Sequence, residues 1–129
     1  WYKIQAQEER DHAMLMIQYL QNNGEKIELN TINKPDKEYS SFGDPLNFGL
    51  EHERYVTGLI HNIYAAANDA HDFRTMQFLD WFVKEQGEEE KNAEDLIKKF
   101  NLSGSDPKGL YMLDNELAAR VYAAPSLVL

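Results

Sequence analysis

The sequence contains no cysteine among its 129 residues. Disulfide frameworks and thiolate metal sites are therefore excluded, and any metal ion would be bound by carboxylate, imidazole, amide or phenol groups. The absence of cysteine also fits the reducing cytoplasm, where we expect the protein to act. No apolar run approaches the roughly 20 residues that a membrane span needs, and no signal-peptide pattern opens the chain. A membrane is therefore not an expected partner.

Basic residues are few. Lys and Arg number 13 against 22 Asp and Glu, so the formal net charge is −9 and the sequence pI is about 4.8. Such a surface repels nucleic acid and attracts cations, which excludes nucleic acid as an expected partner. Many proteins are acidic for solubility alone. The charge is informative only where carboxylates lie at positions that solubility does not require.

Hydrophobic periodicity predicts an all-α fold in a single domain, residues 1–129, and strand patterns are scarce. The expected helices are Trp1–Asn22, Pro45–Ala70, Asp72–Phe100 and Lys108–Ala123. Asn23-Gly24 is expected to end the first helix, and Asp44 to cap the second. The segment Leu102–Pro107 is expected to break the third. Because the first helix begins without a capping residue, we expect the natural chain to start earlier.

The connection Gly24–Gly43 is long for a helical protein. Helices of about 26 residues are roughly 39 Å long, and twenty extended residues reach roughly 66 Å. The connection can therefore run along a whole bundle, whereas the tight joint His71-Asp72 favours antiparallel neighbours. These features predict a four-helix bundle with one long crossover and a short C-terminal helix. Apolar residues favour a crossover packed on the protein over a disordered linker; they are Ile27, Leu29, Ile32, Tyr39 and Phe42.

Each long helix carries a mostly apolar stripe that a polar residue interrupts. The stripes are Tyr2, Gln5, Glu9, His12, Met16 and Tyr19; Leu46, Gly49, Glu53, Val56, Ile60, Ile63 and Ala67; and Leu79, Phe82, Gln86, Glu89, Ala93, Leu96 and Phe100. An unpaired buried carboxylate is costly, and basic partners on these stripes are absent. A divalent or trivalent cation would neutralise the carboxylates together.

Two pairs have the spacing of ligands on one helix face. Glu9 and His12 stand three residues apart, as do Gln86 and Glu89, and Glu53 could face both pairs. Oxygen ligands with one imidazole suit iron, manganese or zinc. Alone, each pair is more often an ordinary surface pair. Together, on predicted inner faces, the five residues predict a metal site.

A second group of carboxylates comprises Glu8, Glu85 and Glu88. Glu85, Glu88 and Glu89 lie on one face and repel one another unless cations bind. The alternative is a helix edge exposed to water. The histidines His52, His61 and His71 have no partner at ligand spacing, and the methionines fit core packing better than haem ligation.

Several motifs resemble the bacterial non-haem ferritins, and the resemblance covers nearly the whole chain. They are Ala6–His12, His52-Glu53, Trp81–Lys91 and Gly109–Asp114. Within them, Glu-Gln-x-Glu-Glu-Glu-Lys is quite specific. Rubrerythrins are excluded because they need cysteine. Bacterioferritins use a second Glu-x-x-His, whereas Asn92 follows Glu89 three residues later here.

The resemblance implies a ferroxidase that stores iron, without haem. Glu9 would bridge two irons, His12 would bind one, and Glu53 and Glu89 the other, with Gln86 near the oxygen-binding side. Glu8, Glu85, Glu88 and Glu89 would form a third iron site. Fe(II) and dioxygen or peroxide would be the substrates, and family members form homo-oligomeric cages of 24 subunits.

The family's first helix, which supplies another Glu ligand, has no counterpart in this sequence. The chain is thus expected to begin with the family's second helix. A non-catalytic iron-binding shell with a crippled centre stays open as an alternative, as does a purely structural helical bundle.

Overall fold

The computed structural model describes residues 1–103 and 106–129, and helices are the only regular elements in that part of the chain. The helices are α1 (Tyr2–Asn22), α2 (Asp44–Asp69), α3 (Phe73–Ser103) and α4 (Pro107–Ala118). The predicted all-α class and the order of the four helices are therefore confirmed. Gly104 and Ser105, in the middle of the predicted break, lie outside the described residues.

The chain forms two compact units. One unit contains Trp1–Lys37 and Tyr111–Leu129, and the other contains Glu38–Leu110. The first therefore holds α1 and the C-terminal residues, and the second holds α2 and α3. That both units form one domain stays a prediction.

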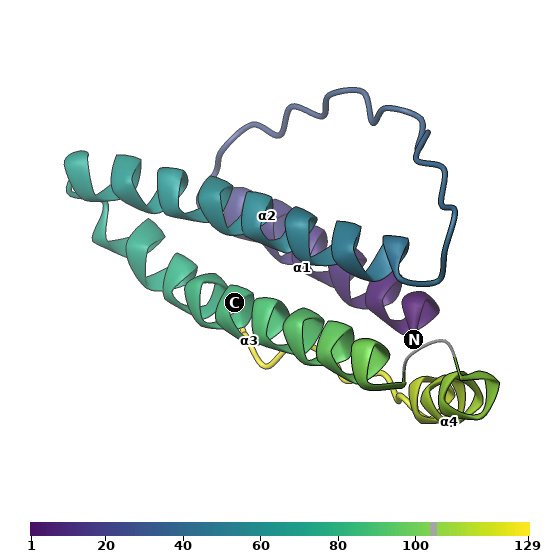
Figure 1. The fold of residues 1–129 in the computed structure, drawn as a ribbon. Helices are drawn as coiled ribbons and strands as arrows, with labels where there is room; N and C mark the ends of the chain where they lie inside the picture. Colours follow the sequence, from purple (N-terminus) through teal and green to yellow (C-terminus); the bar gives the residue numbers. More distant parts are fainter. Residues whose placement is uncertain (104–105) are drawn as a thin grey trace. The chain divides into compact units, whose positions relative to one another are not determined.

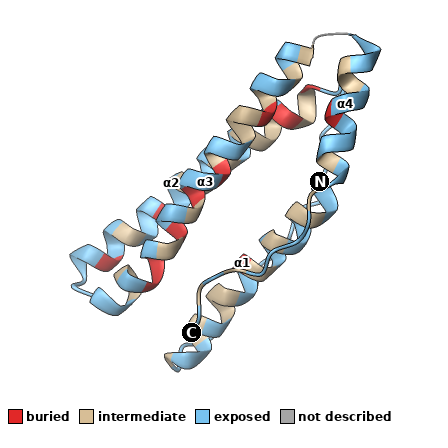
Figure 2. Cartoon of the chain, turned by 90° about the horizontal axis from the view of Figure 1, so that it is seen from below, coloured by how far each residue is buried: buried red, intermediate tan, exposed pale blue. Residues whose placement is uncertain are grey.

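Helices α2 and α3 run antiparallel, side by side, as Figures 1 and 2 show. Their facing sides carry buried apolar residues: Ile60 is 3 % exposed, Leu79 1 % and Phe82 2 %. Full burial of such a side chain stabilises the fold by roughly 1.5–3 kcal/mol. The stripe predicted on the third helix is thus confirmed as its inner face. In the second stripe, Ile63 is 46 % exposed, so its predicted burial is wrong.

Helices α1 and α2 end in the same hydrogen-bonded motif. Each is followed by a residue in the left-handed conformation, Gly24 with φ 75° and His71 with φ 56°. After α2, the His71 N–H donates to the Asn68 carbonyl (3.0 Å) and the Asp72 N–H to the Ala67 carbonyl (2.8 Å). These two bonds satisfy carbonyls at the helix end and fold the chain back into α3. The predicted stop at Gly24 and the tight joint at His71 are both confirmed.

We expect His71→Gly to stabilise the chain. A side chain in the left-handed region costs about 1–2 kcal/mol, partly offset by the extra freedom of glycine in the unfolded state. His71 also stacks on Phe73 at 6.3 Å, so the net gain is expected to be below about 1 kcal/mol. Urea denaturation would measure it. Ala70→Gly, at φ −80°, is the control and should lose stability. Equal losses in both variants would contradict the prediction.

The start of α2 differs from the prediction. Gly43 precedes the helix as its cap, and Asp44 is its first residue, ahead of Pro45. The Asp44 carboxylate turns back along the chain and accepts hydrogen bonds from the hydroxyls and backbone N–H groups of Ser41 and Ser40. These bonds, with that of the Ser41 hydroxyl the strongest, lower the pKa of Asp44 to about 2. Asp44 therefore closes the loop before α2.

Apolar residues of the long connection are largely exposed. Leu29 is 80 % exposed, Ile32 94 % and Phe42 79 %. The prediction that the connection packs on the protein is therefore wrong for these three residues, and Tyr39 is also 50 % exposed. Residues 25–39 form no helix or strand. Hydrophobic composition without helical or strand periodicity gave too little information to place them.

The C-terminal boundaries were predicted least well. Helix α3 continues three residues past Phe100, and α4 ends at Ala118 instead of Ala123. The Asp106 carboxylate accepts a hydrogen bond from the Gly109 N–H (3.0 Å), which caps the first turn of α4. After α4 the chain is extended. Contacts between this extended segment and α1, described below, replace helical hydrogen bonds.

Candidate metal centre

The eight predicted ligands lie on three helices. On α1 they are Glu8, Glu9 and His12; on α2, Glu53; and on α3, Glu85, Gln86, Glu88 and Glu89. The α1 group belongs to one unit, and the α2 and α3 groups belong to the other. Each group is therefore described by itself.

Glu9 and His12 form a pair on α1. The Nδ1 atom of His12 lies 3.6 Å from Oε2 of Glu9, and Gln5 donates a hydrogen bond to Oε1 of Glu9 (2.9 Å). The His12 residue is buried at 9 % exposure, whereas the Glu9 side chain is 46 % exposed. The i,i+3 spacing thus brings a carboxylate and an imidazole together, as the sequence predicted.

Glu53 and Gln86 are brought together between α2 and α3. The Nε2 atom of Gln86 donates to the carbonyl oxygen of Glu53 (3.2 Å) and to its carboxylate Oε2 (3.3 Å). A third acceptor is Oγ1 of Thr57, one turn further along α2, at 3.4 Å. Gln86 is buried at 5 % exposure. Thr57 was not recognised from the sequence, because a single threonine in a helix has no characteristic pattern.

The remaining carboxylates of α3 differ in exposure. Glu89 is buried at 7 % exposure, one turn after Gln86, and Glu85 is half-buried. Glu88 faces water with a side-chain exposure of 60 %, and Lys84 lies 3.4 Å from it. A surface ion pair of this kind contributes at most about 1 kcal/mol. Of the three, Glu89 is the one that water does not readily solvate.

Glu8 has a basic partner that the sequence did not reveal. Arg120, from the extended C-terminal segment, forms an ion pair with Oε2 of Glu8, and the two side chains are 22 % and 13 % exposed. Arg120 also donates to Oε1 of Gln5 (2.7 Å) and lies over the Trp1 ring, 4.5 Å from its centre. The expectation that basic partners are absent concerned the three stripes, and neither Glu8 nor Arg120 belongs to one of them. Because the partners are 112 positions apart in the sequence, no local spacing could have shown the contact.

Tyr122 ties the same segment to α1. Its hydroxyl donates a hydrogen bond to Oδ2 of Asp11 (2.7 Å). This bond lowers the pKa of Asp11 and raises the pKa of Tyr122. The bond therefore stabilises the folded chain at pH values above the unfolded pKa of Asp11 and below the unfolded pKa of Tyr122. This stabilisation is lost when acid protonates Asp11 or when alkali deprotonates Tyr122. The C-terminal segment is thus held on α1 across the neutral range.

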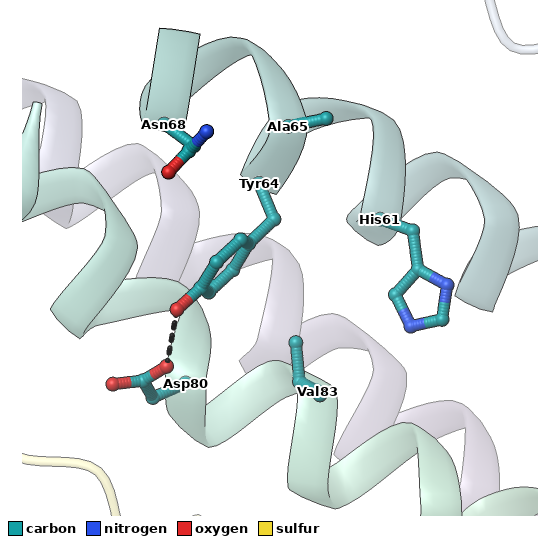
Figure 3. A pocket seen from close by; sticks show the side chains of 6 residues that line it. All are labelled: His61, Tyr64, Ala65, Asn68, Asp80 and Val83. Carbon is teal, nitrogen blue, oxygen red and sulfur yellow. Dashed lines mark hydrogen bonds between the residues drawn. The ribbon is translucent and has the colours of Figure 1, made fainter. Parts of the chain in front are cut away.

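Two surface pockets lie away from the predicted ligands. One, of about 410 Å³, is lined by His61, Tyr64, Ala65, Asn68, Asp80 and Val83. Figure 3 shows Tyr64 of α2 reaching Asp80 of α3, to which its hydroxyl donates at 3.0 Å. This bond raises the pKa of Tyr64. The other pocket, of about 550 Å³, is mainly apolar and includes Tyr39, Phe42 and Phe100.

Within residues 1–103 and 106–129, no three His, Asp or Glu side chains are grouped closely enough to hold a metal ion. The complete di-iron centre therefore stays a prediction, and the structure shows only the pairs Glu9–His12 and Glu53–Gln86. In the same residues, no helix is long and apolar enough to cross a membrane.

Comparison with known proteins identifies the family. Residues 1–103 match the sequence profile of the ferritin-like domain. A bacterial non-haem ferritin of Escherichia coli O6:H1 is 38 % identical over 113 residues, covering 88 % of this chain and 68 % of the relative. The chain belongs to the ferritin family. A second bacterial non-haem ferritin, from Staphylococcus haemolyticus, is 37 % identical over 95 % of this ferritin chain and 74 % of its own length.

Solved structures agree with this assignment. A humanized archaeal ferritin is 41 % identical with a TM-score of 0.92, over 95 % of this ferritin chain and 74 % of its own. An open-pore ferritin from the hyperthermophilic archaeon Archaeoglobus fulgidus is 38 % identical with a TM-score of 0.92, over 94 % and 75 % of the two chains. The predicted ferritin-like fold is thereby confirmed.

Proposed function

We propose that this ferritin chain takes up Fe(II), oxidises it to Fe(III) at a di-iron centre and stores the product as mineral inside a homo-oligomeric cage in the cytoplasm. Membership of the family supports iron as the substrate. The residues predicted from the sequence supply its ligands: Glu9, His12, Glu53 and Glu89, with Gln86 beside them. Carboxylate, imidazole and amide groups suit iron.

One observation carries the proposal. Among the described residues, three polar side chains are buried, and they are His12, Gln86 and Glu89. All three are predicted ligands. His12 and Gln86 have partners within the protein, Glu9 for His12 and Glu53 for Gln86, so the proposal does not depend on a missing partner. Its support is that the buried polar residues are the same residues that the family resemblance implies as iron ligands.

The residues have distinct roles in this proposal. Glu9 bridges the two irons, His12 binds one of them, and Glu53 and Glu89 bind the other. The outer carboxylates Glu8, Glu85, Glu88 and Glu89 form a third site, from which Fe(III) passes to the mineral. Each Fe(II) gives one electron, so two irons reduce one dioxygen, which takes two protons and leaves as hydrogen peroxide. The protein places the ions and balances their charge.

The test is Fe(II) oxidation under air, followed at the ferric absorbance band, with the oligomer size determined in the same sample. We expect a fast first phase that consumes about two irons per chain, as a two-metal site requires. Oxidation no faster than in buffer, in a sample that binds no Fe(II) under argon, would contradict the proposal.

A non-catalytic iron-binding shell is the second candidate. The Arg120–Glu8 ion pair favours it, because the guanidinium already neutralises one carboxylate of the outer site. This candidate predicts Fe(II) binding without dioxygen consumption beyond that of buffer. An oxygen electrode read during iron addition therefore separates it from the ferroxidase.

A further inference from the structure

We infer that Thr57 is a positioning residue of the iron site, which sets the orientation of the Gln86 amide and, through it, of the Glu53 carboxylate. The inference rests on the proposed function for its effect on iron, but its geometry lies wholly within α2 and α3. Thr57 is half-buried and belongs to neither pair that the sequence analysis selected.

The argument begins with a hydrogen bond of fixed direction. Oγ1 of Thr57 lies 2.6 Å from Oε1 of Glu90. An ionised carboxylate can only accept, so the single hydroxyl hydrogen of Thr57 points to Glu90. The oxygen of the hydroxyl then offers only lone pairs to its other neighbour, Gln86, at 3.4 Å. Thr57 therefore accepts a hydrogen bond from the amide NH₂ of Gln86, and it disfavours the flipped orientation in which the amide oxygen of Gln86 would face it.

Arg54 anchors this chain of hydrogen bonds. Its Nε lies 3.9 Å from Oε2 of Glu90, and its Nη2 donates to Oε1 of Glu94 at 2.9 Å. Glu90 is thus held by a cation on one oxygen and by the Thr57 hydroxyl on the other. The Arg54 side chain is 57 % exposed and that of Glu90 28 %, so water screens this ion pair and the Thr57 hydrogen bond is the closer contact of Glu90.

The orientation matters because the same NH₂ group reaches Glu53. Gln86 Nε2 donates to Oε2 of Glu53 at 3.3 Å and to its carbonyl at 3.2 Å. A flipped amide would turn the Gln86 oxygen toward the carboxylate and repel it. Thr57 therefore favours the one amide orientation that holds Glu53, a proposed iron ligand, in a defined position. Hydrogen-bond partners of metal ligands commonly act in this way.

The test compares Thr57→Val, which removes the hydroxyl with little change of shape, with Thr57→Ser, which keeps it. We expect Thr57→Val to slow the first phase of Fe(II) oxidation about tenfold. This is the lower end of the 10–100-fold loss of activity that follows removal of a hydrogen-bond partner of a metal ligand. Thr57→Ser should restore the rate to within twofold. Thr75→Val is the control, because the Thr75 hydroxyl donates to Asp72 at the start of α3, away from the ligands. It should cost stability but leave the rate unchanged.

A second measurement does not depend on oxidation. In metal-free protein labelled with ¹⁵N-glutamine, the side-chain amide signal of Gln86 is assigned by its absence in Gln86→Glu. We expect Thr57→Val to shift this signal and to speed its hydrogen exchange, and Thr57→Ser to leave both unchanged. An unshifted signal in Thr57→Val would overturn the inference. A shifted signal with an unchanged rate would also overturn it while leaving the ferroxidase intact. A parent chain that neither binds nor oxidises Fe(II) would instead overturn the proposed function, and with it the effect on iron.

Discussion

Replacing Glu9 and Glu53 together by Ala is expected to abolish fast Fe(II) oxidation. Each carboxylate contributes to a different part of the proposed centre, Glu9 beside His12 on α1 and Glu53 beside Gln86 between α2 and α3. Loss of a hydrogen-bond partner of a metal ligand already costs 10–100-fold, so loss of two ligands should cost at least about a hundredfold. Stopped-flow absorbance under air would measure the initial rate.

The control for this experiment removes two acids that the proposal does not use. Glu25→Ala combined with Glu51→Ala makes the same charge change at exposed positions. This variant should oxidise iron at the parent rate. A double Glu9/Glu53 variant within threefold of the parent would refute the assignment of the ligands. Because the Glu9 side chain is 46 % exposed, we do not expect its replacement to unfold the protein.

Replacing Phe82 by Ala is expected to give a large loss of stability. The Phe82 ring is 2 % exposed, and its centre lies 5.1 Å from that of Phe78 and 4.9 Å from that of Trp81. Deleting a buried phenyl ring removes its transfer free energy and leaves a cavity, at about 3–5 kcal/mol. Single domains are typically stable by about 5–15 kcal/mol, so this loss would remove from about a fifth to nearly all of the free energy of unfolding.

Urea denaturation followed by circular dichroism would measure the loss. Val83→Ala is the matched control, since Val83 is the next residue and is 38 % exposed. It should lose less than about 1 kcal/mol, as expected for a partly exposed aliphatic residue. Equal urea midpoints for Phe82→Ala and Val83→Ala would contradict the prediction, because they would show that Phe82 does not lie on the inner face of α3.

Local patterns were sufficient to predict much of this molecule. The three- and four-residue steps of Leu79, Phe82 and Leu96 correctly predicted the inner face of α3, because helix geometry fixes which side chains share a face. Gly24 correctly marked the end of α1, since only a few residue types adopt its conformation readily. The same rules placed Glu9 next to His12.

Contacts between distant residues were beyond such patterns. Nothing near Glu8 in the sequence indicates Arg120, and nothing near Gln86 indicates Thr57, which lies 29 residues earlier. The end of α4 was missed for the same reason, because Arg120 and Tyr122 bind α1 instead of continuing the helix. Helix boundaries near a chain end depend on such tertiary contacts as much as on propensity.

The wide separation of Glu8 and Arg120 also has a consequence for the order of events during synthesis. The contacts between α2 and α3 join residues as few as 16 apart, so this hairpin can form while the rest of the chain is still being made. Arg120 pairs with a residue made 112 positions earlier. Until Arg120 has left the ribosome, Glu8 depends on water and cations for neutralisation, so the nascent chain should bind divalent ions at Glu8 more readily than the finished one.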